Sequence, residues 1–471
     1  MRILLTGATG YIGKRLLPVL IKEGHEVICC IRDQSRFSSH NFIQNNTSIL
    51  EVDLNEPSSL TQIPEDIDVA YYLVHSMSAA SDYSDMERNC AINFREALNK
   101  TRVKQVIYLS GIVNEKELSE HLTSRKNVEV ELKKGNFPLT TFRAGIIVGS
   151  GSASFEIIRD LVEKLPVMIA PKWLLTRCQP IAIADVIQIL KKGALNPETY
   201  HQNFDIGSDD ILTYKEMLLG FARVRKLKRK IWIIPVMTPK LSSYWLYFVT
   251  STSFKLASSL VASMKVEVIC RDSRINEMLG IRPIPYKKAI ENAFAKIESN
   301  TILSSWKDAY SSSVAKFNIS DFIHVPRFGC FKEYRQELIQ NTDQTIRKIW
   351  RIGGDNGWYY GNWLWKIRGY IDKLFGGVGL RRGRTNMTQI SPGDALDFWR
   401  VIYANKHEGR LLLYAEMKLP GEAWLEFRIE NGYLNLIATF RPLGLMGRLY
   451  WYSVAPFHGW IFKGLLRELT R

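Results

Sequence analysis

A glycine-rich segment near the start of the chain constrains the fold more than any other part of the sequence. Residues 6–13, Thr-Gly-Ala-Thr-Gly-Tyr-Ile-Gly, directly follow a short β-rich run, Arg2–Thr6, and open a predicted helix, Tyr11–Glu23. A glycine pattern alone is weak evidence, but its position between a first strand and a first helix is typical of a nucleotide-binding turn. A glycine-rich turn that holds no ligand is the alternative.

The rest of the first third alternates between strands and helices. Further predicted strands are Glu26–Ile31, Ser48–Val52, Val69–Val74, Val106–Leu109 and Leu139–Phe142, and further predicted helices are Ser84–Lys100 and Ser119–Lys134. Near-continuous apolar strands separated by helices indicate a parallel sheet that is covered on both faces. With right-handed crossovers, the sequence predicts an α/β, doubly wound fold of the Rossmann type.

The glycines have distinct expected roles in such a turn. Gly7 permits the tight turn, Gly10 lets the backbone approach a pyrophosphate, and Gly13 lets the helix pack close to the sheet. The pyrophosphate would lie on N–H groups at the positive end of the helix. The predicted dinucleotide contacts in this segment are Gly7, Thr9, Gly10, Tyr11, Ile12 and Gly13.

Residues after the second and third strands bear on the choice between NADP and NAD. An arginine at the end of the second strand would hold the extra phosphate of NADP, whereas an acidic residue would hold the ribose hydroxyls of NAD. Arg32 and Asp33 are adjacent, and Arg36 adds positive charge, so the sequence favours NADP over NAD. Asp53 follows the third strand and would accept hydrogen bonds from the adenine amine; a helix N-cap is the alternative role.

Several strings in the first 300 residues resemble the atypical and extended short-chain dehydrogenase/reductase superfamily. They are residues 6–13, Asp53-Leu54, the run 72–77 (Tyr-Leu-Val-His-Ser-Met), the run 108–111 (Tyr-Leu-Ser-Gly), the run 142–150, and Gln179-Pro180-Ile181. Within this superfamily the chain resembles the group related to the NAD(P)-binding accessory subunit of respiratory complex I. The resemblance implies that Asp53, Leu54 and His75 line the cofactor pocket, although a histidine satisfied at a strand end is an alternative for His75.

The catalytic residues depart from the pattern of that superfamily. Its members use a tyrosine, a lysine four residues later, and a serine on the preceding strand that polarises the substrate carbonyl. Ser110 fits the serine position, but His121 and Arg125 fall where the tyrosine and lysine are expected. Histidine can exchange a proton near neutral pH, and arginine can hold a ribose hydroxyl but cannot give up its proton. A domain that binds the nucleotide without catalysis is the alternative.

Composition and charge limit the partners and the compartment. The 471 residues carry a net charge of +16, and only six are cysteines, none in a C-x-x-C spacing, which argues against disulfides and a structural zinc. No signal peptide or membrane-spanning run is recognised, so a cytoplasmic location is expected. Basic and aromatic residues within 223–264 fit either a buried substrate lobe, which the sequence favours, or peripheral contact with the inner face of a membrane. No nucleic-acid recognition motif accompanies the charge.

The last third has a different character, and nine of the twelve tryptophans lie in its 171 residues. We therefore expect a nucleotide-binding domain at 1–300, with a substrate lobe at about 205–300, and a second domain at 301–471. Alternating runs at Asp397–Val401, Arg410–Lys418 and Trp424–Ile429, an Asn431-Gly432 turn and a closing helix at Phe457–Leu469 predict an α+β domain with an antiparallel sheet.

Strings in this last third resemble a domain of unknown function that often follows this dehydrogenase group and is similar to helix-grip, START-like folds. They are residues 353–359, 376–384 and 415–421. Such a domain would enclose a cavity, to which Trp424 and Phe427 could contribute. Arg381, Arg382 and Arg384 could bind an anion or pair with Asp394, Asp397 and Glu416.

The sequence thus predicts an NAD(P)-dependent oxidoreductase, or an epimerase- or dehydratase-like enzyme, acting on a hydrophobic carbonyl or quinone-like substrate. In this hypothesis Ser110 polarises the carbonyl, His121 shuttles the proton and Arg125 holds the ribose. A non-catalytic NAD(P)-binding sensor or assembly factor at a membrane complex is the main alternative. A lipid or isoprenoid carrier is a third hypothesis.

Overall fold

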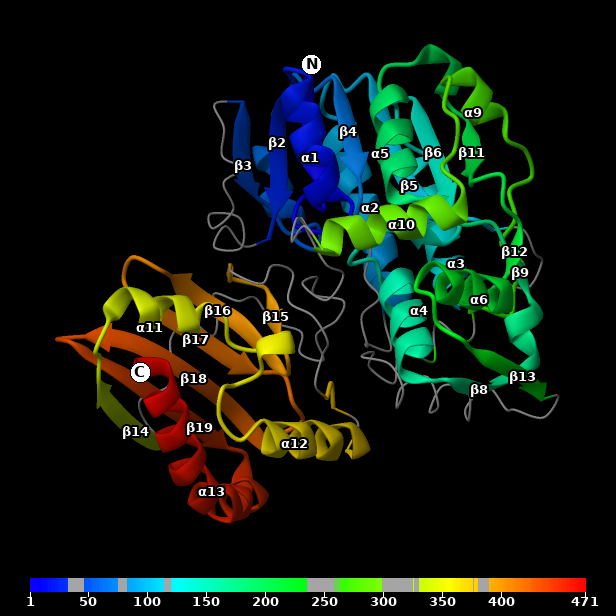
Figure 1. Ribbon diagram of the computed structural model, residues 1–471. Coiled ribbons are helices and arrows are strands. Elements are labelled where there is room, and N and C mark those ends of the chain that lie inside the picture. Colours follow the sequence, from blue (N-terminus) through cyan, green and yellow to red (C-terminus); the bar gives the residue numbers. More distant parts are fainter. Residues whose placement is uncertain are drawn as a thin grey trace. The chain divides into compact units, whose positions relative to one another are not determined.

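The computed structural model describes residues 1–32, 46–74, 83–113, 120–234, 258, 261, 263–298, 325, 330–375, 377–379 and 389–471. They form two compact units, one running from β1 (Arg2–Thr6) to α10 (Tyr286–Glu298) and the other from β14 (Phe331–Leu338) to α13 (Gly444–Thr470) (Figure 1). The predicted domain boundary at residue 300 lies outside the described residues. Each unit has its own sheet and its own core.

The N-terminal unit contains a seven-stranded parallel sheet with the strand order β11-β6-β5-β4-β1-β2-β3 (Figure 1). Besides β1, its strands are β2 (Glu26–Ile31), β3 (Thr47–Glu51), β4 (Val69–Tyr72), β5 (Gln105–Gly111), β6 (Leu139–Ala144) and β11 (Asn203–Ile206). The order reverses direction between β1 and β4, as it does in doubly wound folds. The predicted doubly wound α/β fold is therefore confirmed.

Helices cover both faces of this sheet because successive strand residues point to opposite sides. On one side, the Tyr71 hydroxyl of β4 donates to the carbonyl oxygen of Leu190 at 2.9 Å, near the end of α5 (Ile183–Lys192). On the other side, the ring of Tyr72 packs against Phe94 of α2 (Tyr83–Leu98), with 5.1 Å between the ring centroids. Helix α1 (Gly13–Lys22) lies beside α5, and α3 (Glu120–Leu132) lies beside α2.

Glycine is required where β1 turns into α1. Gly7 has φ +69°, a conformation that side chains with a Cβ rarely adopt. A Cβ on Gly13 would lie 2.2 Å from the carbonyl oxygen of Gly7, which no side chain could tolerate. Helix α1 therefore begins directly against the end of β1, at the carboxyl edge of the sheet.

A smaller lobe is built from elements that follow β6. Its strands pair two by two: β7 (Ile147–Val148) with β10 (Ile181–Ala182), β8 (Val167–Pro171) with β13 (Lys230–Ile234), and β9 (Arg177–Cys178) with β12 (Leu212–Thr213). Phe155 of α4 (Ala153–Lys164), Phe221 of α6 (Tyr214–Val224) and Phe294 of α10 pack together in its core. The lobe thus includes α4 and β8, which precede residue 205, because these elements supply part of the same core.

Part of the basic cluster at 223–230 stabilises the end of α4. Arg229 donates to the carbonyl oxygens of Val162 and Glu163, which lie in the last turn of that helix. Arg225 lies 3.6 Å from the Glu163 carboxylate and stacks over the ring of Phe294. The apolar part of the suspected membrane lobe, residues 235–257, lies outside the described residues. No helix within the described ranges is long and apolar enough to cross a membrane.

The C-terminal unit contains a six-stranded antiparallel sheet with the order β14-β19-β18-β17-β16-β15 (Figure 1). Besides β14, its strands are β15 (Ala395–Leu396), β16 (Trp399–Asn405), β17 (Arg410–Ala415), β18 (Gly421–Glu430) and β19 (Tyr433–Pro442). Helices α11 (Thr342–Ile349) and α13 share one core with this sheet, and α12 (Asn362–Leu374) packs at its border. The predicted antiparallel sheet with a closing helix is confirmed.

Of three local predictions in this unit, the hairpin is confirmed, and the starts of one strand and of the closing helix are wrong. Asn431 and Gly432 both have positive φ, 51° and 80°, and join β18 to β19 as the predicted two-residue hairpin. The expected strand at Asp397–Val401 is wrong at its start, because Asp397 has φ +53° and turns the chain between β15 and β16. The closing helix begins at Gly444, not Phe457, because Pro456 lies inside the helix and does not end it.

Glu416 forms a buried ion pair with Arg400. The Arg400 guanidinium lies 2.9 Å from Glu416 Oε1, and its Nη1 also donates to the Gly393 carbonyl oxygen at 2.7 Å. Asp397 accepts a 2.7 Å hydrogen bond from the indole N–H of Trp358. The arginines at 381–384, which we expected to pair with these carboxylates, lie outside the described residues.

We expect Glu416→Gln to lower the free energy of unfolding of this unit by about 3 kcal/mol, because it removes the carboxylate charge that is paired with the buried Arg400 guanidinium. The matched control is Glu430→Gln, which breaks the exposed Arg428–Glu430 pair and should cost less than about 1 kcal/mol. Urea unfolding followed by tryptophan fluorescence measures both, since nine of the twelve tryptophans lie in residues 301–471. Equal losses in the two variants would contradict the prediction.

Candidate functional site

The carboxyl edge of the parallel sheet holds the candidate nucleotide site of the N-terminal unit. Gly10 donates its N–H to the Gly7 carbonyl oxygen at 2.9 Å and closes the turn. Among the described residues, the only atom within 4 Å of a Cβ added to Gly10 would be that same oxygen, at 3.1 Å, so no described side chain lies against that face of Gly10. The N–H groups of Ile12 and Gly13 precede the first helical hydrogen bond, which Lys14 donates to Gly10. This arrangement can receive a phosphate.

Thr6 ties the glycine turn to the neighbouring strand. Its hydroxyl donates to the Tyr71 carbonyl oxygen at 2.9 Å and accepts from the Leu73 N–H at 3.2 Å. A Cβ on Gly7 would lie 2.7 Å from the Leu73 carbonyl oxygen. The ends of β1 and β4 are therefore held together at the point where the strand order reverses, which is where doubly wound folds bind their ligands.

Tyr11 and Arg15 stabilise the glycine turn. The sequence did not predict the role of Arg15. The Arg15 guanidinium lies 4.0 Å from the centroid of the Tyr11 ring and donates to the carbonyl oxygens of Tyr11, at 3.2 Å, and Ser150, at 2.7 Å. Burial raises the pKa of the Tyr11 hydroxyl to about 12. The Tyr11 side chain thus packs against the loop that precedes α4, and half-buried Thr9 and Ile12 flank it in the turn.

Arg32 and Asp53 both lie at the carboxyl edge, one residue beyond β2 and two residues beyond β3. Arg32 is exposed, and both charges act on the Cys90 thiol of α2. Asp53 Oδ1 accepts from the Asn55 N–H at 2.9 Å, so the alternative role as cap of the short helix at Pro57–Gln62 is not what the structure shows. Leu54 is buried, and its carbonyl oxygen accepts from the Asn93 side chain at 2.8 Å.

Arg125 packs against the end of β5, the strand that carries Ser110. An added Cβ on Gly111 would lie 3.4 Å from Arg125 Cδ and 3.8 Å from its Nη1, so the arginine packs onto the strand end because residue 111 has no side chain. The Ser110 Oγ and the Arg125 Nε are both buried and make no hydrogen bond within the described parts of the chain. A buried polar group without a hydrogen-bond partner is uncommon in a protein interior, so Ser110 and Arg125 mark this strand end as a place where a polar ligand would be held.

Buried polar contacts fix the helix that carries Arg125. The Ser124 hydroxyl donates to the Glu87 carboxylate of α2, and Arg143 of β6 lies 2.6 Å from the Glu129 carboxylate of α3. The Tyr108 hydroxyl donates to the Arg125 carbonyl oxygen at 3.3 Å. Burial raises the pKa of Tyr108 to about 12, so this tyrosine is neutral at physiological pH and acts as a structural contact.

Three predicted site residues cannot be placed at this edge. Arg36 and His75 lie outside the described residues. His121 lies in the first turn of α3, but its side chain is outside the described part of the structure. Within the described ranges, no group of three histidine, cysteine, aspartate or glutamate side chains could hold a metal ion.

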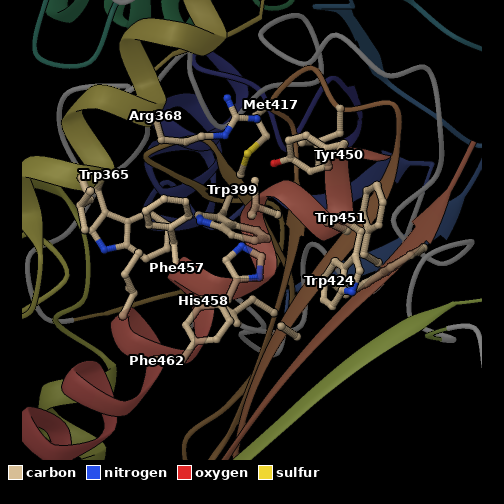
Figure 2. Close-up of a pocket in the computed structure, with 18 of the residues that line it drawn as sticks. Trp365, Arg368, Trp399, Met417, Trp424, Tyr450, Trp451, Phe457, His458 and Phe462 are labelled. Atoms are coloured by element: carbon tan, nitrogen blue, oxygen red, sulfur yellow. The ribbon is translucent and has the colours of Figure 1, made fainter. Parts of the chain in front are cut away.

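The C-terminal unit contains a separate apolar cavity of about 330 Å³ between its sheet, α12 and α13 (Figure 2). Aromatic side chains dominate its wall: Trp365, Trp399, Trp424, Tyr450, Trp451, Phe457 and Phe462. Trp424 therefore lines the cavity as expected, whereas Phe427 is buried in the core on the same strand and does not. The clustering of tryptophans in the sequence was a signal for this cavity, but it did not identify the helices that form its wall.

Two ionisable side chains border this cavity. Arg368 extends from α12 towards Met417 and Tyr450, with its guanidinium 5.9 Å from the centroid of the Tyr450 ring (Figure 2). Burial, with a smaller effect of the Arg368 charge, lowers the pKa of His458 to about 4. His458 is therefore neutral at physiological pH, and the interior of the cavity suits an uncharged ligand.

Comparisons with known proteins agree with this division of the chain. A family model described as NAD(P)H-binding matches residues 7–134, and a model described as protein of unknown function (DUF2867) matches residues 330–465. The photosystem II assembly factor Ycf39 of Trieres chinensis is 24% identical over 241 residues, which cover 48% of this chain and 72% of that protein. The chloroplastic divinyl chlorophyllide a 8-vinyl-reductase of Arabidopsis thaliana is 23% identical over 225 residues, 44% of this chain and 53% of that protein.

Solved structures show the same fold at low sequence identity. A nucleoside-diphosphate-sugar epimerase of Staphylococcus aureus has a TM-score of 0.51 and 14% identity, and the match covers 62% of this chain and 100% of that one. WbmG of Bordetella bronchiseptica, in complex with NAD and UDP, has a TM-score of 0.50 and 14% identity, covering 65% and 97%. One part of the chain, residues 7–134, therefore matches the NAD(P)H-binding family model and lies in a unit with the fold of these solved structures, and another part, residues 330–465, matches the DUF2867 model.

Proposed function

We propose that the chain is an NADP(H)-dependent oxidoreductase of the atypical short-chain dehydrogenase type, with domains at 1–300 and 301–471. The pyrophosphate would lie on the N–H groups of Ile12 and Gly13, because these precede the first helical hydrogen bond, whereas the Gly10 N–H already donates to the Gly7 carbonyl oxygen. Exposed Arg32 would face the extra phosphate of NADP, and Asp53 would contact the adenosine half. Arg36 and His75 are proposed to line the same pocket.

The observation that carries the catalytic part of this proposal is the pair of unsatisfied polar groups at the end of β5. Ser110 Oγ can donate a hydrogen bond to a substrate carbonyl oxygen, and Arg125 can hold a ribose hydroxyl through its guanidinium. His121, four residues before Arg125, would exchange a proton with that oxygen near neutral pH. A bound nicotinamide would supply or accept the hydride.

The substrate class follows from the second unit. Its cavity of about 330 Å³ is walled by aromatic and aliphatic side chains and contains no group that is charged at neutral pH apart from Arg368 at its border. A hydrophobic carbonyl or quinone-like compound would match this lining. Ser110 and the cavity thus support one hypothesis, in which the carboxyl-edge site acts on a compound that the second domain also binds.

A non-catalytic role is the second candidate, and one specific departure favours it. The tyrosine and lysine of the superfamily are replaced by His121 and Arg125, and arginine does not deprotonate. Sequence similarity to a photosystem II assembly factor fits a protein that binds the dinucleotide and helps to assemble a membrane complex. The two candidates differ in whether the bound dinucleotide turns over.

Arg32→Ala should weaken NADPH binding about tenfold and change NADH binding by less than about twofold, because only NADPH carries the additional phosphate. Isothermal titration calorimetry of the full chain with each dinucleotide measures the effect. Lys104→Ala is the matched control, since it removes the same charge at the start of β5 on the opposite edge, where Lys104 pairs with Asp68. An unchanged NADPH affinity in Arg32→Ala would contradict the assignment.

Ser110→Ala should lower kcat for NADPH oxidation by about 10²-fold without changing the Kd for NADPH, because the lost hydrogen bond acts on the substrate oxygen. Stopped-flow and steady-state assays with a panel of quinones and enones measure kcat, and His121→Ala should show a comparable loss. Thr123→Ala, at an exposed position of α3, is the control and should leave kcat unchanged. Tight NADPH binding with no turnover of any compound would favour the non-catalytic role.

A further inference from the structure

Helix α12 exposes a row of large apolar side chains. Trp363, Ile367, Tyr370 and Leu374 are exposed by 58, 48, 61 and 55%, and Phe375, directly after the helix, by 69%. The spacings of four, three and four residues place the four helical positions on one face of α12. A row of this size on a single face differs from the isolated apolar residues that every protein surface carries.

Residues 444–460 of α13 continue this apolar surface. Leu445, Met446, Leu449, Tyr452 and Trp460 are exposed by 71, 69, 55, 65 and 51%. The two helices border the same cavity, and Figure 2 shows Arg368 of α12 reaching towards Tyr450 of α13. We call the exposed apolar side chains of residues 363–375 and 445–460 the aromatic face.

The exposed charged side chains within residues 362–374 and 444–463 have one sign. Residues 362–374 contain Lys366, Arg368 and Lys373, and their single acidic residue, Asp372, is buried, where it accepts from the N–H groups of Gly379 and Lys418. Residues 444–463 contain two basic residues, Arg448 and Lys463, and no acidic residue. The aromatic face therefore carries positive charge with no carboxylate exposed on either helix segment.

This combination of apolar and basic residues favours one kind of binding partner over the others. Tryptophan and tyrosine suit the boundary between water and hydrocarbon, and lysine and arginine suit anionic headgroups. A second copy of the chain fits less well, because a two-fold contact would bring the same positive surface against itself. The surface complements an anionic bilayer in both polarity and charge.

The cavity reaches the surface at the aromatic face. Ile367, Ile371 and Phe457 line the cavity and are also exposed by 48, 39 and 57%. We propose that α12 and residues 444–460 of α13 dock this protein on an anionic bilayer, with the mouth of the apolar cavity facing the lipid. This docking does not depend on nucleotide binding, and it places the membrane contact in the C-terminal unit, not at residues 223–264.

Flotation of the full chain with lipid vesicles tests the proposal. We expect the protein to bind vesicles of phosphatidylcholine that contain about 30% phosphatidylglycerol, an anionic lipid. Binding to vesicles of phosphatidylcholine alone should be at least about tenfold weaker. Binding should fall as NaCl rises from about 0.05 to about 0.5 M, because salt screens exposed charges. Leu445→Glu should weaken binding about tenfold, and Lys366→Glu about fivefold or more.

Two matched variants distinguish this surface from others. Leu338→Glu places the same charge at a position 60% exposed on β14 of the same unit, and Trp232→Glu does so at a position 60% exposed on β13, in the lobe first suspected of membrane contact. Both should bind vesicles as the wild type does, and circular dichroism should show that all variants are folded. All the substituted side chains are largely exposed or basic, so folding should be preserved.

Three results would overturn the proposal. The first is an absence of wild-type flotation with either vesicle. The second is loss of binding in Trp232→Glu together with full binding in Leu445→Glu, which would place the contact at the N-terminal lobe. The third is a wild-type dimer in sedimentation that Leu445→Glu dissociates while vesicles bind neither protein, which would assign the aromatic face to a second copy.

Discussion

The close contact between Gly13 and the Gly7 carbonyl oxygen is the constraint on which the nucleotide site depends. A Cβ at residue 13 would lie 2.2 Å from that oxygen, so only glycine lets α1 start directly against the end of β1. This contact directs the first N–H groups of α1 to the carboxyl edge of the sheet. Thr6 then ties β1 to β4, and Arg15 holds the turn to the loop before α4. The site is thus a consequence of backbone packing, to which side chains add support.

The sequence predicted the parts of the fold that depend on local patterns. The strand–glycine–helix start, the parallel sheet and the Asn431-Gly432 hairpin each follow from a short-range signal, and each is present. The start of α13 was missed because Pro456 lies inside an otherwise helical run. The turn at Asp397 was missed because its positive φ is stabilised by tertiary contacts, including the bond from Trp358, which lies 39 residues earlier.

The candidate site was predicted unevenly for the same reason. Residue types and spacing pointed to the glycines and to Ser110, but not to Arg15, whose role arises only when the β7–α4 loop folds back over Tyr11. The apolar cavity was expected from the resemblance to helix-grip folds. Its walls come from α12, β16, β18, β19 and α13, and which residues of those elements face inward depends on how they pack, so Trp424 but not Phe427 contributes to the lining.

The charges on strand β14 bear on the solubility of a unit that exposes so many apolar side chains. Among the described strands it forms one edge of the antiparallel sheet and pairs only with β19. Its sequence, Phe-Lys-Glu-Tyr-Arg-Gln-Glu-Leu, places charged residues at four of eight positions. Charges along an edge strand discourage the addition of another strand, which is the first step of amyloid-like aggregation. The protein can therefore expose apolar side chains on its helices while the charges on β14 oppose the addition of another strand to its sheet.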